Sequence, residues 1–194
     1  MFTKQNSVGL FGVEAYMVQV EADLSQGMPC FDIVGLPDAA VKESRDRVRA
    51  AVRNCGFTFP VGRVTVNLAP ADIRKEGALY DLPLLVALLK AAGEIDADLT
   101  DAAFIGELSL DGTVRPVNGL LAMAIKVRQS GCKRFFVPAA NGAEGSVVEG
   151  LEVYAIESVP QLLAHLRGGE ALQPVKPGTA DLSALPPVPD FSDV

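Results

Sequence analysis

The sequence is poor in the residues that build compact metal or catalytic sites. Its 194 residues include one histidine, three cysteines and no tryptophan. Cys30, Cys55 and Cys132 are far apart and form no C-x-x-C pair, so neither a disulfide framework nor a zinc site is predicted. A reducing, cytoplasmic location fits this cysteine usage best. His165 lies near the end of an expected helix, where a surface or capping role is predicted.

Long apolar runs and nucleotide-binding motifs are also missing. The longest apolar run, LPLLVALL at residues 82–89, is far shorter than the ~20 residues that cross a bilayer, so no membrane partner is expected. The dipeptide Gly-Lys never occurs, which excludes a phosphate-binding P-loop, and G-x-G-x-x-G is absent as well. No metal or other cofactor is therefore expected in this chain.

Acidic residues outnumber basic ones. The net charge of −7 and the isoelectric point near 4.7 argue against a protein that coats nucleic acid or anionic membrane over its whole surface. A local basic patch is compatible with these totals, and one helix and the loop ADIRKEG supply it. The candidates for nucleic-acid contact are Lys42, Arg45, Arg49, Arg53, Arg74 and Lys75.

The same helix has a simpler interpretation as an ordinary charged surface. Glu43 with Arg47, and Lys42 with Asp46, are spaced four residues apart, and such pairs stabilise a solvated helix. Contact with nucleic acid and plain solvation therefore both remain open for this element.

The spacing of apolar residues predicts a mixed α/β domain. Residues 13–24 and 30–36 are expected to form strands that pair as an antiparallel ribbon around a turn at 25–27. Helices are expected at 39–54, from 81 to about 92, at 120–130 and at 158–167, with further strands at 61–70, 132–138 and 151–156 and a hairpin around 110–113. Because strands and helices alternate in the later half, we expect an α/β fold, a mixed sheet with βαβ crossovers.

The composition changes after residue 168. Residues 169–194 are rich in proline and small residues, which is typical of an extended linker. The sequence therefore predicts a domain at residues 1–168 followed by a linker at 169–194.

Three long blocks carry a family resemblance. They are GLPDAAVKESRDRVRAAV, VTVNLAPADIRKEGALYDLPLLVALL and FIGELSLDGTVRPVNGLLAMAIKVRQSGCKRFFVP, and together they resemble the N-terminal domain of the ComM/YifB family of magnesium-chelatase-like AAA+ ATPases. The ending DFSDV resembles the junction with the ATPase module. The resemblance implies a fold like the proteolytic domain of Lon protease, and implies an ATPase module that this chain lacks.

Lon-type peptidases use a serine and a lysine, and neither is found at the corresponding positions. Laying the Lon segment D-G-P-S-A-G on EGALYD without gaps puts Leu79 at the serine, and the match of NGLLAM puts Met123 at the lysine. Lys126 is three residues further along the helix, most of a turn away from Met123. The resemblance therefore implies a domain without catalytic residues, which is not an enzyme by itself.

The resemblance also implies roles for the complete protein. It would be a ring, expected to be a hexamer, that binds ATP and magnesium in its ATPase module and acts as a helicase on branched DNA during recombination and natural transformation. This domain would then serve assembly, through contacts with its own ATPase module and neighbouring subunits, and contact DNA without sequence preference. The alternatives are a residual Lon-like peptidase and a magnesium-chelatase-type subunit.

Overall fold

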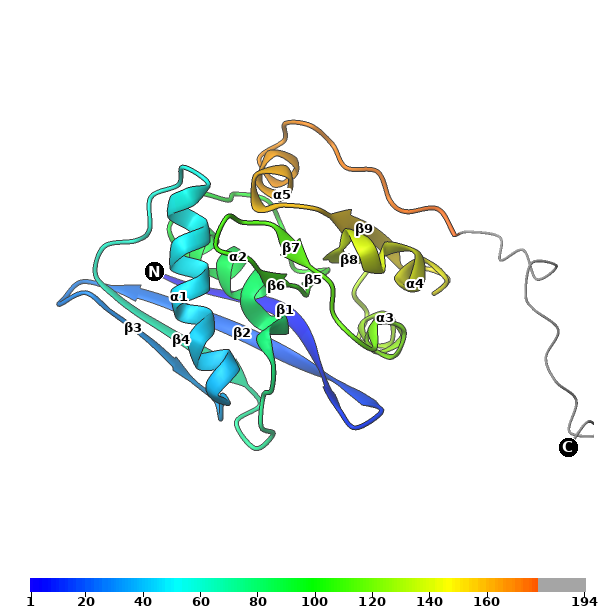
Figure 1. Cartoon of the computed structure of the whole chain (residues 1–194), viewed down its shortest axis with the longest axis horizontal. Helices are drawn as coiled ribbons and strands as arrows, with labels where there is room; N and C mark the ends of the chain where they lie inside the picture. The colour runs from blue at the N-terminus through cyan, green and yellow to red at the C-terminus, as the bar shows by residue number, and fades with distance from the viewer. Residues whose placement is uncertain (178–194) are drawn as a thin grey trace, which may run out of the picture.

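The computed structural model describes residues 1–177, and a single sheet of seven strands organises them (Figure 1). The strand order is β3-β4-β2-β1-β5-β8-β9, and β6 and β7 form a separate ribbon. The strands are β1 Phe2–Phe11, β2 Glu14–Ser25, β3 Cys30–Val34, β4 Arg63–Ala69, β5 Ala102–Phe104, β6 Glu107–Leu108, β7 Val114–Arg115, β8 Arg134–Pro138 and β9 Glu152–Ile156. The helices are α1 Ala39–Asn54, α2 Asp81–Ala91, α3 Leu120–Gln129, α4 Gly142–Ser146 and α5 Val159–Leu166. The mixed α/β fold is confirmed.

The pairing of the first strands differs from the prediction. β1 precedes the expected first strand and pairs with β2 in antiparallel register from Phe2–Asp23 to Phe11–Glu14. β4 occupies the other edge of β2, and β3 pairs in parallel with β4. The predicted ribbon between residues 13–24 and 30–36 is therefore wrong. The physical reason is that β3, α1 and β4 form a crossover unit, which returns β4 between β2 and β3.

Polar side chains on the buried face of β1 explain why the apolar pattern does not reveal this strand. Gln5 and Ser7 are buried, and both are hydrogen-bonded to carbonyl groups of the segment that contains β5. The Gln5 Nε2 atom donates to the Ala102 oxygen at 2.9 Å, and the Ser7 hydroxyl donates to the Phe104 oxygen at 2.9 Å. These bonds connect the antiparallel part of the sheet to its parallel part.

Helices cover both faces of the sheet. Val64, Val66 and Leu68 alternate along β4 toward a core shared with α1 and α2. α2 lies inside this core, with every residue buried except Lys90. On the opposite face α3 packs over Val8, and this second cluster contains residues of β5, β8 and β9 as well.

The segment after α5 continues along the edge of the sheet. The Leu172 N–H donates to His165 Nδ1 at 3.1 Å, and the Val175 N–H donates to the Val153 oxygen at 2.8 Å. Residues 170–177, called the strap below, thus lie beside β9 without forming a helix or strand. The rest of the predicted linker, at 178–194, lies outside the described residues. Among residues 1–177 no helix is long and apolar enough to cross a membrane.

Candidate functional site

Leu79 and Met123, the two residues that the predicted alignment places at the Lon serine and lysine, both contact the apolar core. Leu79 lies in a short 3-10 turn at the start of α2, and its side chain packs against both core clusters. Met123 is fully buried in α3, within the second cluster. Neither side chain has an atom that could attack a peptide bond or accept a proton. The absence of a catalytic dyad at these two positions stays a prediction, and the structure shows apolar packing there.

The carboxylate of Asp38, which precedes α1, holds the turn before α2 in place. Asp38 caps α1, with its Oδ1 accepting from the Val41 N–H at 2.7 Å. The other carboxylate oxygen accepts from the Gly77 N–H at 3.1 Å. Gly77 has a φ of 82°, a conformation that favours glycine. A single carboxylate thus links the start of α1 to the turn that carries Leu79.

Lys75 is buried, which removes it from the predicted nucleic-acid contacts. Its ammonium group donates to the backbone oxygens of Pro70 and Ile73, the latter at 2.8 Å. Burial lowers the pKa of Lys75. Its backbone also pairs with the neighbouring loop, since the Lys75 N–H donates to the Leu36 oxygen at 3.1 Å. Lys75 therefore shapes its own loop and does not present a cation on the surface.

A buried ion pair connects α1 to α2. Asp81 is fully buried, and its carboxylate accepts from Arg47 Nε at 2.6 Å, from Arg47 Nη2 at 3.1 Å and from the Leu108 N–H at 3.1 Å. The bond with Asp81 raises the pKa of Arg47. The predicted pair of Glu43 with Arg47 is present at 3.6 Å, but Glu43 is exposed. The pair with Asp81 was missed because the two residues are 34 positions apart.

Two tyrosine hydroxyls meet beneath β1. The hydroxyl oxygens of Tyr16 and Tyr80 lie 3.2 Å apart, and the Tyr16 hydroxyl also donates to the Arg74 backbone oxygen at 3.3 Å. Burial raises the pKa of both phenols, so both stay neutral and act as hydrogen-bonding groups. A Cβ atom at Gly9 would lie 2.2 Å from the Tyr80 oxygen, which explains the glycine in the middle of β1.

The other predicted cations remain accessible to different degrees. Lys42 and Arg45 line a groove of about 460 Å³ with Arg63, beside the edge strand β3. Arg45 lies 3.5 Å from Asp46, so Asp46 pairs with Arg45 instead of the predicted Lys42.

The remaining three cations differ in their contacts. The Arg49 guanidinium lies 5.1 Å from the centre of the Phe59 ring, and Arg74 pairs with Glu76 at 3.6 Å. Arg53 is exposed at the end of α1. The structure thus adds Arg63 to the basic surface and leaves Lys42, Arg45, Arg49, Arg53 and Arg74 as contact candidates.

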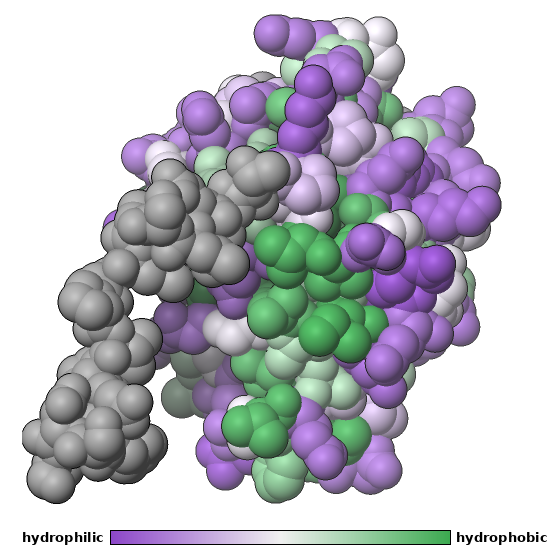
Figure 2. Space-filling model, turned by 90° about the vertical axis from the view of Figure 1, so that its right-hand side faces the viewer, coloured by the Kyte–Doolittle hydropathy of each residue, from purple (hydrophilic) through white to green (hydrophobic). Residues whose placement is uncertain are grey.

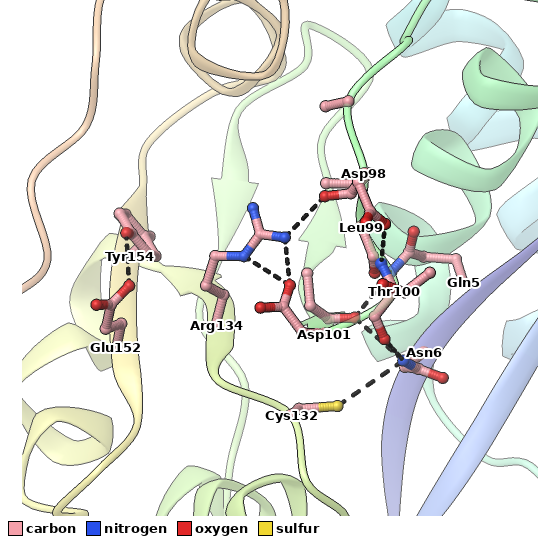
Figure 3. A network of polar contacts seen from close by, with 12 residues as sticks. Gln5, Asn6, Asp98, Leu99, Thr100, Asp101, Cys132, Arg134, Glu152 and Tyr154 are labelled. Carbon is pink, nitrogen blue, oxygen red and sulfur yellow. Dashed lines mark hydrogen bonds and ion pairs between the residues drawn. The ribbon is translucent and has the colours of Figure 1, made fainter.

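A polar network borders a groove of about 550 Å³ (Figure 3). Arg134 donates to the Asp101 carboxylate and, at 2.7 Å, to the Asp98 oxygen. Asn6 donates to the Thr100 oxygen at 3.1 Å and lies 3.8 Å from Cys132 Sγ. These groups bond to one another and to the backbone, so the network fixes the loop before β5. Within residues 1–177 no group of three or more metal-ligating side chains is clustered.

Comparison with known proteins identifies the family. A family model described as subunit ChlI of Mg-chelatase matches residues 20–141. The chain belongs to this ChlI family. The protein YifB of Escherichia coli is 40% identical over 184 residues, which are 94% of this chain and 36% of YifB. The competence protein ComM of Haemophilus influenzae is 40% identical over 162 residues, which are 83% of this chain and 32% of ComM.

Two further relatives are a mycobacterial protein and a Lon protease, and the second supports the Lon-like fold. An uncharacterized protein of Mycobacterium tuberculosis is 44% identical over 167 residues, 86% of this chain and 33% of that protein. Lon protease 2 of Bacillus subtilis is 27% identical over 126 residues, 64% of this chain and 22% of the protease. The predicted resemblance to ComM, YifB and the Lon domain is thus confirmed. The ChlI-family chain spans about a third of the length of ComM and YifB.

Proposed function

We propose that this chain is the non-catalytic, Lon-like domain of a cytoplasmic AAA+ ATPase of the ComM/YifB type. The observation that carries the proposal is the packing of Leu79 against the core and the burial of Met123 within it, at the positions that the resemblance aligns with the Lon dyad. ATP and magnesium belong to the ATPase part of the complete protein. The domain serves the assembly of a ring, expected to be a hexamer, in which the motor acts on branched DNA.

A peptidase assay tests the non-catalytic role directly. The purified chain is incubated with a fluorescently labelled unfolded protein, beside Leu79→Ala and Met123→Ala variants. We expect all three proteins to release no more fluorescence than buffer. Cleavage by the wild-type chain that either variant abolishes would overturn the proposal, because it would assign these positions to a working active site.

Contact with DNA is a second function, favoured by the groove beside β3. Lys42, Arg45 and Arg63 converge on it, and Arg49 and Arg53 continue the basic row along α1. The net charge of −7 means that such contact would be local. Phosphate contacts of this kind bind without sequence preference and weaken steeply with salt.

Fluorescence anisotropy with single-stranded and four-way-junction DNA tests this contact at two salt concentrations. We expect binding at low salt that Lys42→Glu with Arg45→Glu abolishes. The matched control is Arg128→Glu with Lys133→Glu, which changes the net charge equally at exposed positions outside the groove. An equal loss of DNA binding in both double variants would show that binding depends on the total charge and not on the groove. Absence of DNA binding by the wild type would contradict a DNA-binding role of the domain.

A further inference from the structure

The side of the molecule that carries α3, α4 and the β1–β2 turn has an exposed apolar face. Figure 2 shows apolar side chains gathered at the centre of this side, which lies on the right in Figure 1. The large apolar residues exposed on these elements are Phe11, Val13, Leu121, Ile125 and Val147, with exposed fractions of 76%, 89%, 41%, 43% and 54%. Apolar patches of this kind on a soluble protein mark interaction sites.

Residues 120–125 of α3 are apolar on both the inner and the outer side of the helix, whereas its last turn is polar except for Val127. Its inner residues Met123, Ala124 and Val127 are buried against the sheet. Leu121 and Ile125 are one turn apart on the outer side, where the described residues leave them exposed. A stretch of helix that is apolar all round, as residues 120–125 are, is typically buried on all sides. The outer side of α3 therefore has the composition of an interface.

The strap brings the end of the described chain to this same side. Val175 bonds to β9, and its methyl groups lie beside Gly142 at the start of α4. Val147 lines a hollow of about 490 Å³ together with Pro174, Val175 and Pro177. Whatever follows residue 177 thus starts next to an exposed residue of the apolar face.

We propose that the face formed by Leu121, Ile125 and Val147 docks the ATPase part of the same polypeptide. This inference rests on the proposed function, and on relatives of which this chain spans only 32% to 36%. The strap fixes the place where the chain leaves the domain. Because that place is next to the apolar face, the ATPase part is held at a high local concentration near this face. An apolar contact of modest area is then sufficient for stable docking, and docking fixes the orientation of the domain on the ring.

Thiol accessibility in the full-length protein tests the docking. Ile125→Cys and Val61→Cys are made in the full-length protein and in the 194-residue chain, and maleimide labelling of each site is followed by peptide mass spectrometry. Val61 is 90% exposed and precedes β4, outside the elements that carry the apolar face, so it serves as the matched control. We expect labelling at position 125 to be at least tenfold slower in the full-length protein, with equal rates at position 61.

Dilution distinguishes docking within one polypeptide from contact with a second copy, and a parallel ATPase assay tests the proposed function separately. Protection at position 125 that persists on dilution supports docking within one polypeptide. Protection that disappears on dilution assigns the face to a second copy and overturns the proposal, as do equal rates in both proteins. ATP hydrolysis without protection rejects the docking alone, whereas protection without ATP hydrolysis keeps the docking and rejects the proposed ATPase.

Discussion

Asp81 shows how one residue can look ordinary in the sequence and be critical in the fold. Its position before a leucine-rich stretch predicts only the start of a helix. In the structure its carboxylate is fully buried and depends on Arg47 and the Leu108 N–H for partners. A buried charge that loses its partner is strongly destabilising, whereas an exposed ion pair contributes little.

We expect Arg47→Ala to lower the free energy of unfolding by about 3 kcal/mol, because it leaves the Asp81 carboxylate buried without its counter-ion. Urea denaturation followed by circular dichroism measures the change. Arg45→Ala is the matched control, since Arg45 is exposed and its ion-pair partner within residues 1–177 is the exposed Asp46, and its effect should stay within about 0.5 kcal/mol. Equal effects of the two substitutions would contradict the assignment of the buried pair.

His165 should make stability depend on pH. Burial lowers its pKa from 6.5, nearby Arg134 acts in the same direction, and Nδ1 must be unprotonated to accept from the Leu172 N–H. The unfolded chain therefore binds a proton more readily than the folded one, so stability falls as the pH drops below about 6.5.

Urea midpoints of wild type and His165→Asn between pH 8 and pH 5 check this dependence. Carboxylates titrate in both proteins, so the informative quantity is the difference between the two curves. The wild type should lose more stability than the variant as the pH drops. Parallel curves would show that the histidine does not contribute.

At the scale of elements, one cap links the start of α1 to the turn before α2. Asp38 serves α1 through one oxygen and the Gly77 turn through the other. We expect Asp38→Ala to cost about 2 kcal/mol, the upper end for a lost N-cap, because it leaves two backbone N–H groups without partners. Thermal and urea unfolding should give Asp38→Asn a stability between those of the wild type and Asp38→Ala, since asparagine retains one oxygen acceptor. An asparagine variant as unstable as the alanine variant would contradict this account.

The elements also show where sequence patterns succeed and fail. The bounds of α1 and the β6–β7 hairpin follow from local signals, an aspartate cap and an Asp-Gly turn. β1 was missed because Gln5 and Ser7 occupy its buried face. The predicted pairing of β2 with β3 failed because strand partners are chosen by contacts between distant segments, which local periodicity does not encode.

At the scale of the whole molecule, Leu79 connects the two halves of the core. Its side chain packs against the cluster under α1 and α2 and against the cluster under α3. We expect Leu79→Ala to lower stability by about 2 kcal/mol, within the range for leucine truncation but reduced by its partial exposure. Unfolding should remain one transition, because the two clusters pack on opposite faces of one sheet.

Circular dichroism and tyrosine fluorescence test this cooperativity, since Tyr16 and Tyr80 report on the region around Leu79. The two signals should give one urea midpoint in the wild type and one lower midpoint in Leu79→Ala. Separate midpoints in either protein would show that the clusters unfold independently.

The sequence by itself determined the fold class, through local spacing, and the family, through the residues of three long blocks, whereas the absence of a Lon dyad stays a prediction. It also located Lys42 and Arg45 on one helix. Only the tertiary structure decided that Lys75 is buried, that Arg63 joins the basic groove and that Arg47 neutralises Asp81. Burial and partner choice depend on segments far apart in the chain, whose approach is set by packing of the whole sheet and its helices.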